Sequence, residues 1–437
     1  MRRAIILGAA GRDFHNFHVF FKNNPDFEVA CFTAAQIPFI SDRVYPAELT
    51  GKRYPNGIPI KDEDELENLI EKYKVKDVFF SYSDISFERV MRLACRAMAK
   101  GASFHLLSPE DTWLISERPV IAITGVRTGA GKSTVSREVF KMLKRWGRRP
   151  VVVRHPMPYL GFYESLRFET REDLNNLPIT IEEREEFELH IENGAVVYCG
   201  VNYRKILDLA EREGDVIIWD GGNNDFPFYK PDIYITVVDA NRAGQELGYY
   251  PGEVNLRRAD IVILNKVNLA KEAEVRAIRE RVKGVNAKAV LLEAASEPIL
   301  VPDINLSGKK VLVVEDGPTV THGGLSEAAG AKAARKAGGI LLDPKNYARG
   351  SIRRAYEEFP HIGHVLPALG YSKEQVKELE ESINSTPADV VVLGTPADLS
   401  RLMYIEKPMV KVRLRLRFTS VLKLDQVLWT RFKKLIA

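Results

Sequence analysis

Cysteine is scarce in this chain: three residues among 437, Cys31, Cys95 and Cys199, lie far apart. Cysteines so few and so spaced form neither a disulfide framework nor a CxxC site, so we expect a protein of the reducing cytoplasm. Glutamine is almost as scarce, whereas lysine, arginine and glutamate are plentiful. That imbalance is typical of heat-adapted proteins.

A strong excess of one charge is also absent. The 63 Lys and Arg residues against 59 Asp and Glu residues leave a net charge of +4, too small to indicate nucleic acid or an anionic membrane as a partner. No apolar run approaches the roughly 18 residues of a membrane span. Apolar residues 4–10 lead into a glycine turn without a cleavage site, so they predict a buried strand and not a signal peptide.

What the chain does have is a regular alternation of apolar runs and helical patterns, which predicts an α/β fold with mostly parallel sheets. We divide it into a Rossmann-like N-terminal domain (1–117), a P-loop nucleotide-binding domain (118–305) and a C-terminal α/β region (306–437). The C-terminal region either extends the preceding sheet or forms a separate domain. Between 156 and 193 lies a long charged stretch, and insertions of this kind often bind or cover ligands.

The first glycine turn, Gly8 to Gly11, departs from the dinucleotide-binding pattern GxGxxG, because Phe14 stands where a third glycine would fall. A domain used for packing or for another ligand is therefore favoured over a dinucleotide site.

A second glycine-rich segment, between an apolar strand and a helix, is the strongest signal in the sequence. Its glycines let backbone N–H groups surround phosphate oxygens, the helix adds its positive N-terminal end, Lys132 reaches the β- and γ-phosphates, and the Ser133 hydroxyl ligates Mg²⁺. Val126 occupies the usual place of the first glycine, which here comes one residue early. The predicted nucleotide-binding residues of this loop are Gly125, Arg127, Thr128, Gly129, Ala130, Gly131, Lys132, Ser133 and Thr134.

Two later segments agree with this loop. Asp220 ends an apolar strand, as does the carboxylate that holds Mg²⁺ or its water in P-loop enzymes. Asn265, Lys266 and Asn268 resemble the NKxD motif with which GTPases read guanine. Because an amide replaces the carboxylate at Asn268, guanine is matched less well and adenine becomes credible. ATP is therefore the expected nucleotide, with GTP as the alternative.

These motifs resemble the SIMIBI branch of P-loop proteins, which includes CobW, HypB and UreG-like GTPases. More closely, residues 126–133, 154–158, 315–323 and 394–399 resemble the archaeal cyclic 2,3-diphosphoglycerate synthetase family. The resemblance spans about residues 120–418 and does not include the N-terminal region. It implies an ATP- and Mg²⁺-dependent enzyme that closes 2,3-diphosphoglycerate into a ring through an intramolecular phosphoanhydride, releasing ADP and phosphate.

For this reaction we expect Lys132, Arg127, Asp220, Arg154 and His155 to be catalytic. Arg154 and His155 end the strand beside the loop, where they are also candidates for binding substrate phosphates. Hydroxyls and backbone N–H groups after a later strand, before a helix expected near Leu325, form a possible second phosphate cradle. Its residues are Thr319, Thr321, His322, Gly323 and Gly324. A solvated or purely structural role is the alternative for each of these side chains.

The main alternative function is a regulatory or metallochaperone GTPase of the CobW, HypB or UreG kind. Against it stand the missing CxxC motif and His-rich tract and the Asn268 substitution. Arg127 occupies the place of the lysine with which MinD-like proteins reach a neighbouring subunit, so we expect a homodimer. His361 and His364 form an isolated HxxH pair without further ligands, and Arg413, Arg415 and Arg417 form a basic strand face; neither pattern is assigned a function.

Overall fold

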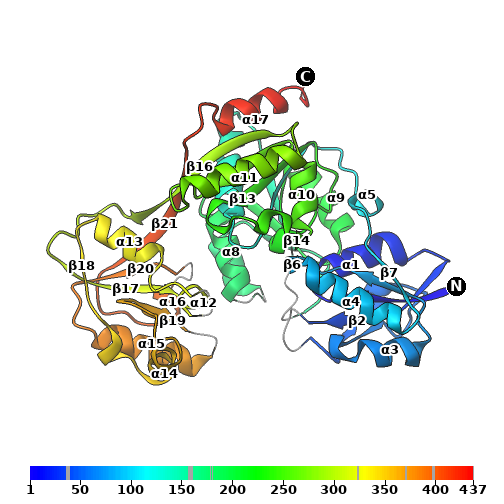
Figure 1. The fold of residues 1–437 in the computed structure, drawn as a ribbon, viewed down its shortest axis with the longest axis horizontal. Coiled ribbons are helices and arrows are strands. Elements are labelled where there is room, and N and C mark those ends of the chain that lie inside the picture. Colours follow the sequence, from blue (N-terminus) through cyan, green and yellow to red (C-terminus); the bar gives the residue numbers. More distant parts are fainter. Residues whose placement is uncertain are drawn as a thin grey trace. The chain divides into compact units, whose positions relative to one another are not determined.

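The computed structural model describes residues 1–35, 40–155, 161–177, 179, 181–321, 324–369, 372–395 and 399–436. Contacts within it separate two units, one of residues 1–295 with 418–437 and the other of residues 296–417 (Figure 1). No helix in these described ranges is long and apolar enough to cross a lipid bilayer. The three-region boundaries drawn from the sequence remain predictions.

The N-terminal part of the first unit is a six-stranded sheet in the order β3-β4-β2-β1-β5-β7. All of its pairs are parallel except β3 with β4. The order reverses at β1, where sheets of this kind place their ligand crevice. The strands are β1 (Arg2–Leu7), β2 (Phe27–Ala34), β3 (Val44–Tyr45), β4 (Ile58–Asp62), β5 (Asp77–Phe80) and β7 (Ser103–His105), and the helices are α1 (Arg12–Asn16), α2 (Ala47–Thr50), α3 (Leu66–Tyr73), α4 (Phe87–Ala99) and α5 (Pro109–Thr112).

Aromatic side chains form much of the core of this sheet, because the phenylalanines of residues 14–21 recur on one helical face. Phe14, for example, stacks on Tyr45 with ring centroids 4.3 Å apart. A short antiparallel pair, β6 (Ile85–Ser86) with β14 (Tyr249–Tyr250), joins this part of the chain to the second sheet.

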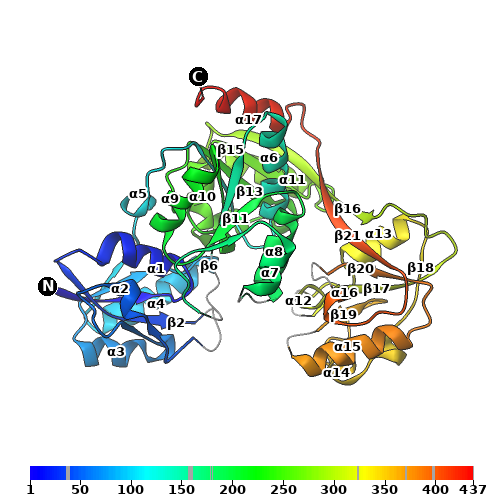
Figure 2. The same ribbon diagram turned by 180° about the vertical axis from the view of Figure 1, so that it is seen from behind.

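The second sheet of the first unit contains the phosphate loop. Its strand order is β10-β11-β9-β12-β8-β13-β15-β16, and only β10 runs antiparallel to its neighbour. Figures 1 and 2 show helices over both faces. The strands are β8 (Val120–Gly125), β9 (Pro150–Arg154), β10 (Leu166–Phe168), β11 (Val196–Cys199), β12 (Val216–Asp220), β13 (Ile233–Asp239), β15 (Ile261–Asn265) and β16 (Val290–Val301), and the helices are α6 (Lys132–Arg145), α7 (Arg171–Asn176), α8 (Ile181–Ile191), α9 (Tyr203–Glu213), α10 (Gly252–Arg258) and α11 (Glu272–Val285).

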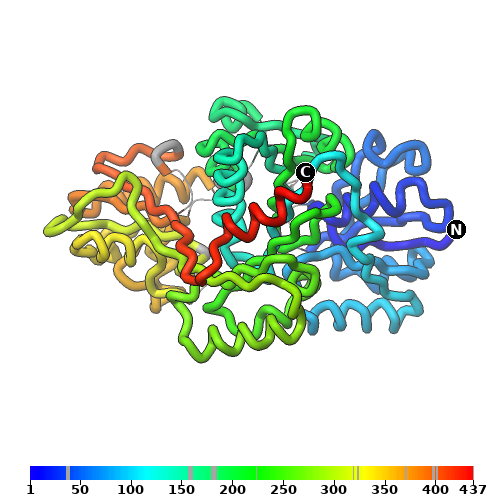
Figure 3. Tube along the Cα trace, turned by 90° about the horizontal axis from the view of Figure 1, so that it is seen from above, coloured from blue at the N-terminus to red at the C-terminus, as the bar shows by residue number. Residues whose placement is uncertain are grey.

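The central strands β8, β12, β13 and β15 are continuously buried, as expected for parallel strands that are covered on both faces. The last helix, α17 (Leu424–Phe432), returns to this unit, and Figure 3 follows that return along the chain. Arg431 pairs with Asp260, and the rings of Trp429 and Trp146 pack with centroids 4.9 Å apart.

The second unit is a smaller parallel sheet in the order β21-β20-β17-β18, with β19 also paired to β17. Its strands are β17 (Lys310–Asp316), β18 (Ile340–Leu341), β19 (Leu366–Ala368), β20 (Val390–Leu393) and β21 (Met409–Phe418), and its helices are α12 (Gly317–Val320), α13 (Ala329–Lys336), α14 (Gly350–Glu358), α15 (Lys373–Ser385) and α16 (Leu399–Leu402).

The predicted α/β class, with its Rossmann-like N-terminal part and its P-loop sheet, is confirmed. A strand over residues 150–154 and a helix over residues 87–99, which the sequence patterns predict, are confirmed as β9 and α4. The helix expected near Leu325 begins instead at Ala329. The edge strands β10 and β11 were not predicted, because three or four residues carry too little periodicity.

Candidate functional site

The phosphate loop connects the buried strand β8 to the 14-residue helix α6, as its sequence predicts. Gly129 and Gly131 have positive φ angles of 83° and 105°, which side chains rarely adopt. At Gly131 a Cβ would also lie 2.3 Å from Asn265 Nδ2. The loop therefore requires glycine at both places. Ser133 and Thr134 lie in the first turn of α6, at its positive end.

Lys132 is half-buried at the start of α6, and its Nζ donates a 2.7 Å hydrogen bond to Asn224 Oδ1. Burial lowers the pKa of this ammonium group, although nearby carboxylates such as Asp220 act in the opposite direction. Gly125 explains the early glycine of the motif: a Cβ there would lie 2.7 Å from Asn224 Oδ1. The early glycine thus makes room for an asparagine that the sequence analysis did not identify.

Asp220 lies at the end of β12, fully buried, with two donors on one carboxylate oxygen. Its Oδ2 accepts hydrogen bonds from Arg154 Nη1 at 2.7 Å and His190 Nε2 at 2.8 Å. Burial alone would raise its pKa, but Arg154, His190 and Lys132 together hold the pKa of this carboxyl below its usual range. Asp220 is therefore an anion.

The second oxygen of this carboxylate, Asp220 Oδ1, is buried and has no hydrogen-bond partner among the residues that the structure describes. A buried anionic oxygen without a partner fits a hard cation such as Mg²⁺, which prefers carboxylate, hydroxyl and water ligands. Asp220 and Ser133 are the residues that would hold it.

Arg154 is 2% exposed and also pairs with Glu186 of α8, so two carboxylates surround its guanidinium group. The charged insertion thereby supplies two residues, Glu186 and His190, that the sequence analysis did not single out. His155, predicted beside Arg154, lies 3.0 Å from Asp225 Oδ2. The structure brings both predicted residues next to the phosphate-loop sheet but pairs each with a carboxylate.

Asp225 links this site to the N-terminal sheet. Arg12, 3% exposed, pairs with Asp225 and donates to the Phe226 carbonyl at 2.8 Å. Its guanidinium also lies over the rings of Phe226 and Phe228. A buried cation, anion and aromatic group thus connect the start of α1 to the loop after β12. No local pattern in the sequence marks this contact, because its members are more than 200 residues apart.

Asn265 and Lys266 fold back onto the phosphate loop. Asn265 Nδ2 donates to the Ala130 carbonyl at 2.9 Å, and Lys266 Nζ donates to the Gly129 carbonyl at 2.7 Å. Lys266 Nζ also reaches Asp239 Oδ2 at 2.7 Å. The NKxD-like segment therefore supports the loop directly, while base reading by Asn268 stays a prediction.

Arg127 is held on three sides within its own chain. Its Nε lies 2.7 Å from Asp84 Oδ1, its Nη1 donates to Gln245 Oε1 at 2.8 Å, and its guanidinium lies over the Tyr249 ring. Asp84 Oδ2 accepts a hydrogen bond from the Thr128 amide at 3.2 Å. Asp84, which the sequence analysis missed, thus places a carboxylate of the N-terminal part on the phosphate loop.

In the second unit, the hydroxyls predicted to bind phosphate make local contacts. Thr319 Oγ1 donates to Asp316 Oδ2 at 2.6 Å, and Thr321 Oγ1 donates to the Gly317 carbonyl at 2.9 Å. Gly324 follows this turn with a φ angle of 69°. The predicted residues His322 and Gly323 lie outside the described residues. These local bonds are those expected if Thr319 and Thr321 stabilise the turn, which is the alternative to phosphate binding.

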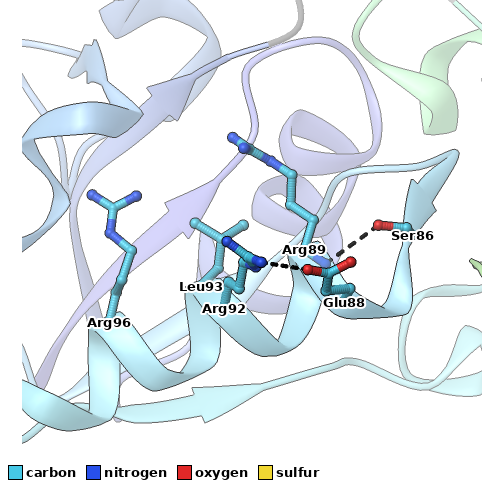
Figure 4. Close-up of a pocket in the computed structure, with 6 residues that line it drawn as sticks. All are labelled: Ser86, Glu88, Arg89, Arg92, Leu93 and Arg96. Carbon is cyan, nitrogen blue, oxygen red and sulfur yellow. Dashed lines mark hydrogen bonds and ion pairs between the residues drawn. The ribbon is translucent and has the colours of Figure 1, made fainter.

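The arginines of helix α4 line a pocket but are already paired with carboxylates. A surface pocket of about 350 Å³ on α4 carries Arg89, Arg92 and Arg96 (Figure 4). Each of these arginines pairs with a glutamate, so this pocket is a poor anion site.

In the second unit, the two sequence patterns without an assigned function make structural contacts. His361 Nε2 contacts the Val320 carbonyl at 2.9 Å. Arg415 and Arg417 both pair with Glu297 of the same unit.

Comparison with known proteins defines the family. The arginine synthetase ArcE of Thermococcus kodakarensis is 53% identical over 432 residues, covering 98% of this chain and 96% of that protein. The chain belongs to the ArcE synthetase family. It is an ATP-dependent synthetase, which confirms the predicted enzyme class. A cyclic 2,3-diphosphoglycerate synthetase from the same organism is 28% identical over 348 residues, covering 72% of this chain and 76% of that protein.

Two further matches of this ArcE-family chain are to a domain family and to a solved structure. Residues 218–293 match the CobW/HypB/UreG nucleotide-binding domain family, in agreement with the resemblance drawn from the motifs. Among solved structures, LpxK from Aquifex aeolicus in complex with ATP aligns with a TM-score of 0.47 and 13% identity, covering 85% of this chain and all of that one.

Proposed function

We propose that this ArcE-family chain is an ATP- and Mg²⁺-dependent arginine synthetase. The observation that carries the proposal is the 53% identity to an arginine synthetase over nearly the whole of both chains. The cyclic 2,3-diphosphoglycerate synthetases, which the sequence motifs favour, are more distant relatives. Formation of cyclic 2,3-diphosphoglycerate is therefore the second candidate.

The charges around the phosphate loop also favour arginine synthesis over the formation of cyclic 2,3-diphosphoglycerate. Cations near the loop already have carboxylate partners: Arg127 with Asp84, Arg154 with Asp220 and Glu186, Arg12 with Asp225, and Lys266 with Asp239. A substrate with about five negative charges needs cations that are free to neutralise it. An amino acid with charges of both signs makes no such demand, and carboxylates suit its ammonium group.

The chemistry follows from the product. A guanidinium carbon bears three nitrogens, so we infer that the last C–N bond forms when ammonia displaces the oxygen of a ureido precursor. Transfer of the γ-phosphoryl group to that oxygen, with release of ADP, makes it a leaving group, and it departs as phosphate. Lys132 and the loop amides would hold the β- and γ-phosphates. Bound at Asp220 and Ser133, Mg²⁺ would neutralise phosphate charge.

The test compares substrates in one experiment. The protein is incubated with Mg²⁺, ATP or GTP, and either citrulline with ammonium or 2,3-diphosphoglycerate. Products are followed by ³¹P NMR and by mass spectrometry for arginine. We expect ATP-dependent arginine formation with equal amounts of ADP and phosphate. A cyclic phosphoanhydride from the diphosphoglycerate would replace our proposal by the second candidate, and GTP hydrolysis indifferent to both would favour a regulatory GTPase.

The homodimer suggested by Arg127 is likewise a proposal. Mass photometry of the purified protein at nanomolar to micromolar concentration tests it directly.

A further inference from the structure

Asn224 occupies an unusual position four residues after the end of β12. It closes the short turn Gly222–Asn224, is fully buried, and has a φ angle of 57°, in the left-handed region that asparagine and glycine tolerate best. Its backbone carbonyl accepts a 2.8 Å hydrogen bond from Asn255 Nδ2. The turn is therefore fixed, and it directs one polar side chain at the phosphate loop.

That side chain contacts two parts of the loop with its two different atoms. Asn224 Oδ1 accepts from Lys132 Nζ at 2.7 Å, and Asn224 Nδ2 donates to Thr128 Oγ1 at 3.3 Å. Gly125 lacks a side chain where a Cβ would meet Oδ1. Asn224 thus contacts the lysine and the threonine of the loop, and the early glycine leaves space for its side chain.

The partner of Lys132 changes when a triphosphate enters the loop. The ammonium of such a lysine binds the β- and γ-phosphate oxygens, so Asn224 Oδ1 here accepts the hydrogen bond that a phosphate oxygen would accept. Within the described part of the chain, Asn224 Nδ2 makes only the long hydrogen bond to Thr128 Oγ1, and it is a neutral donor next to that position. A carboxylate at 224 would repel a phosphate, whereas a carboxamide provides both an acceptor and a donor.

We propose that Asn224 is a γ-phosphate-binding residue. Its Oδ1 holds Lys132 in position before the nucleotide binds, and its Nδ2 donates to a γ-phosphate oxygen once Lys132 has moved to the phosphates. ADP lacks that oxygen, so Asn224 distinguishes ATP from ADP. The inference depends on ATP use by this family and not on which acid or amine is the second substrate.

The experiment measures the dissociation constants of ATP and ADP by calorimetry, with Mg²⁺ and without any second substrate. Asn224→Gly removes the amide but keeps a residue suited to the left-handed backbone. Asn224→Asp keeps the shape and introduces a negative charge. We expect both variants to lose about tenfold or more in ATP affinity, as for the loss of a hydrogen bond to a charged group. ADP affinity should change far less, and Asn224→Asp should show the larger loss for ATP.

A matched control is Asn286→Ala. Asn286 Nδ2 donates to the carbonyls of Leu256 and Ala259 at the end of α10, and it contacts neither Asn224 nor Lys132 in the hydrogen bonds of the described residues. This variant should lower the melting temperature and leave the ratio of ATP to ADP affinity unchanged. If the Asn224 variants weaken ATP and ADP equally, or leave ATP binding intact, Asn224 is a structural residue only and the proposal is wrong. If the protein forms no arginine, the proposed function is wrong, but the measured ATP and ADP affinities still decide the role of Asn224. The two proposals can therefore be contradicted independently.

Discussion

Lys132 shows how a functional residue is placed at a cost to the folded chain. Its half-buried ammonium lies against a neutral amide, and this burial lowers its pKa because the charged form is poorly solvated. A group of this kind contributes little to stability until an anion arrives. The same poor solvation strengthens its attraction to a phosphate.

We therefore predict that Lys132→Ala reduces ATP turnover at least about a thousandfold while the melting temperature stays within a few degrees of the parent value. ATP should raise the melting temperature of the parent protein much more than that of the variant. Scanning fluorimetry with and without ATP, beside a turnover assay, measures both effects. Retained turnover would mean that another segment binds the triphosphate.

Among the elements, the two glycine turns of the first unit behave differently. The turn after β1 is filled from within: the Asp13 carboxylate accepts hydrogen bonds from the Ala10, Gly11 and Phe14 amides. In dinucleotide-binding folds a pyrophosphate lies against amides of this turn. An internal carboxylate therefore stands in the place of that anion, in agreement with the expectation that this domain serves packing or another ligand.

The same turn predicts a pH effect. Burial raises the pKa of Asp13 from 3.8 to about 6, although the backbone N–H groups oppose the shift. Between these values the folded protein binds more protons than the unfolded chain, so the contribution of Asp13 to stability falls as pH rises from about 4 to about 6. Compared with the parent protein, Asp13→Asn should gain relative stability over this pH range, as followed by melting temperature.

Asp173→Asn provides a control of opposite sign. The Glu169 and Thr170 amides hold the pKa of the Asp173 carboxyl below its usual value, so its contribution is present above about pH 4 and is lost on acidification. Removing this charge should therefore cost more stability as pH rises. Parallel melting curves for Asp13→Asn and the parent protein would contradict the assignment of Asp13.

At this scale, the sequence predicts those functional residues that are adjacent to one another in the chain. Residues 125–134 were identified because loop, lysine, hydroxyl and flanking elements are adjacent in the chain. Asp84, His190 and Asn224 were missed because they reach the site from distant segments and match no local pattern. Arg154 and His155 were located on the right strand, but their carboxylate partners become visible only when β9, β12 and α8 are packed together.

For the whole molecule, the connection between the two sheets of the first unit depends on buried charge. Arg12, Asp225 and His155 join the turn after β1 to the ends of β9 and β12. Asp225 directly follows Asn224, so the residue proposed to bind the γ-phosphate is adjacent to the one that binds the N-terminal sheet. A change at the nucleotide site would therefore act on the sheet contact.

Arg12→Ala should consequently lower the free energy of unfolding by about 3–5 kcal/mol, because the buried Asp225 carboxylate would lose its arginine partner and keep only His155 beside it. Chemical denaturation measures this loss. Arg92→Ala is the matched control, since Arg92 forms an exposed pair with Glu88 on α4 and should cost under about 1 kcal/mol. Equal small losses for both variants would show that the buried pair is not needed to hold the sheets together.

The return of residues 418–437 to the first unit makes the second unit an internal insertion in the gene. The Thr419 amide donates to the Glu293 carbonyl at 2.9 Å, so the two ends of the interrupted segment are neighbours. A shortened gene that joins codon 295 to codon 418 through a brief glycine-serine spacer would encode the first unit intact. A stop codon placed after residue 295 would instead delete α17 and expose the apolar surface that it covers.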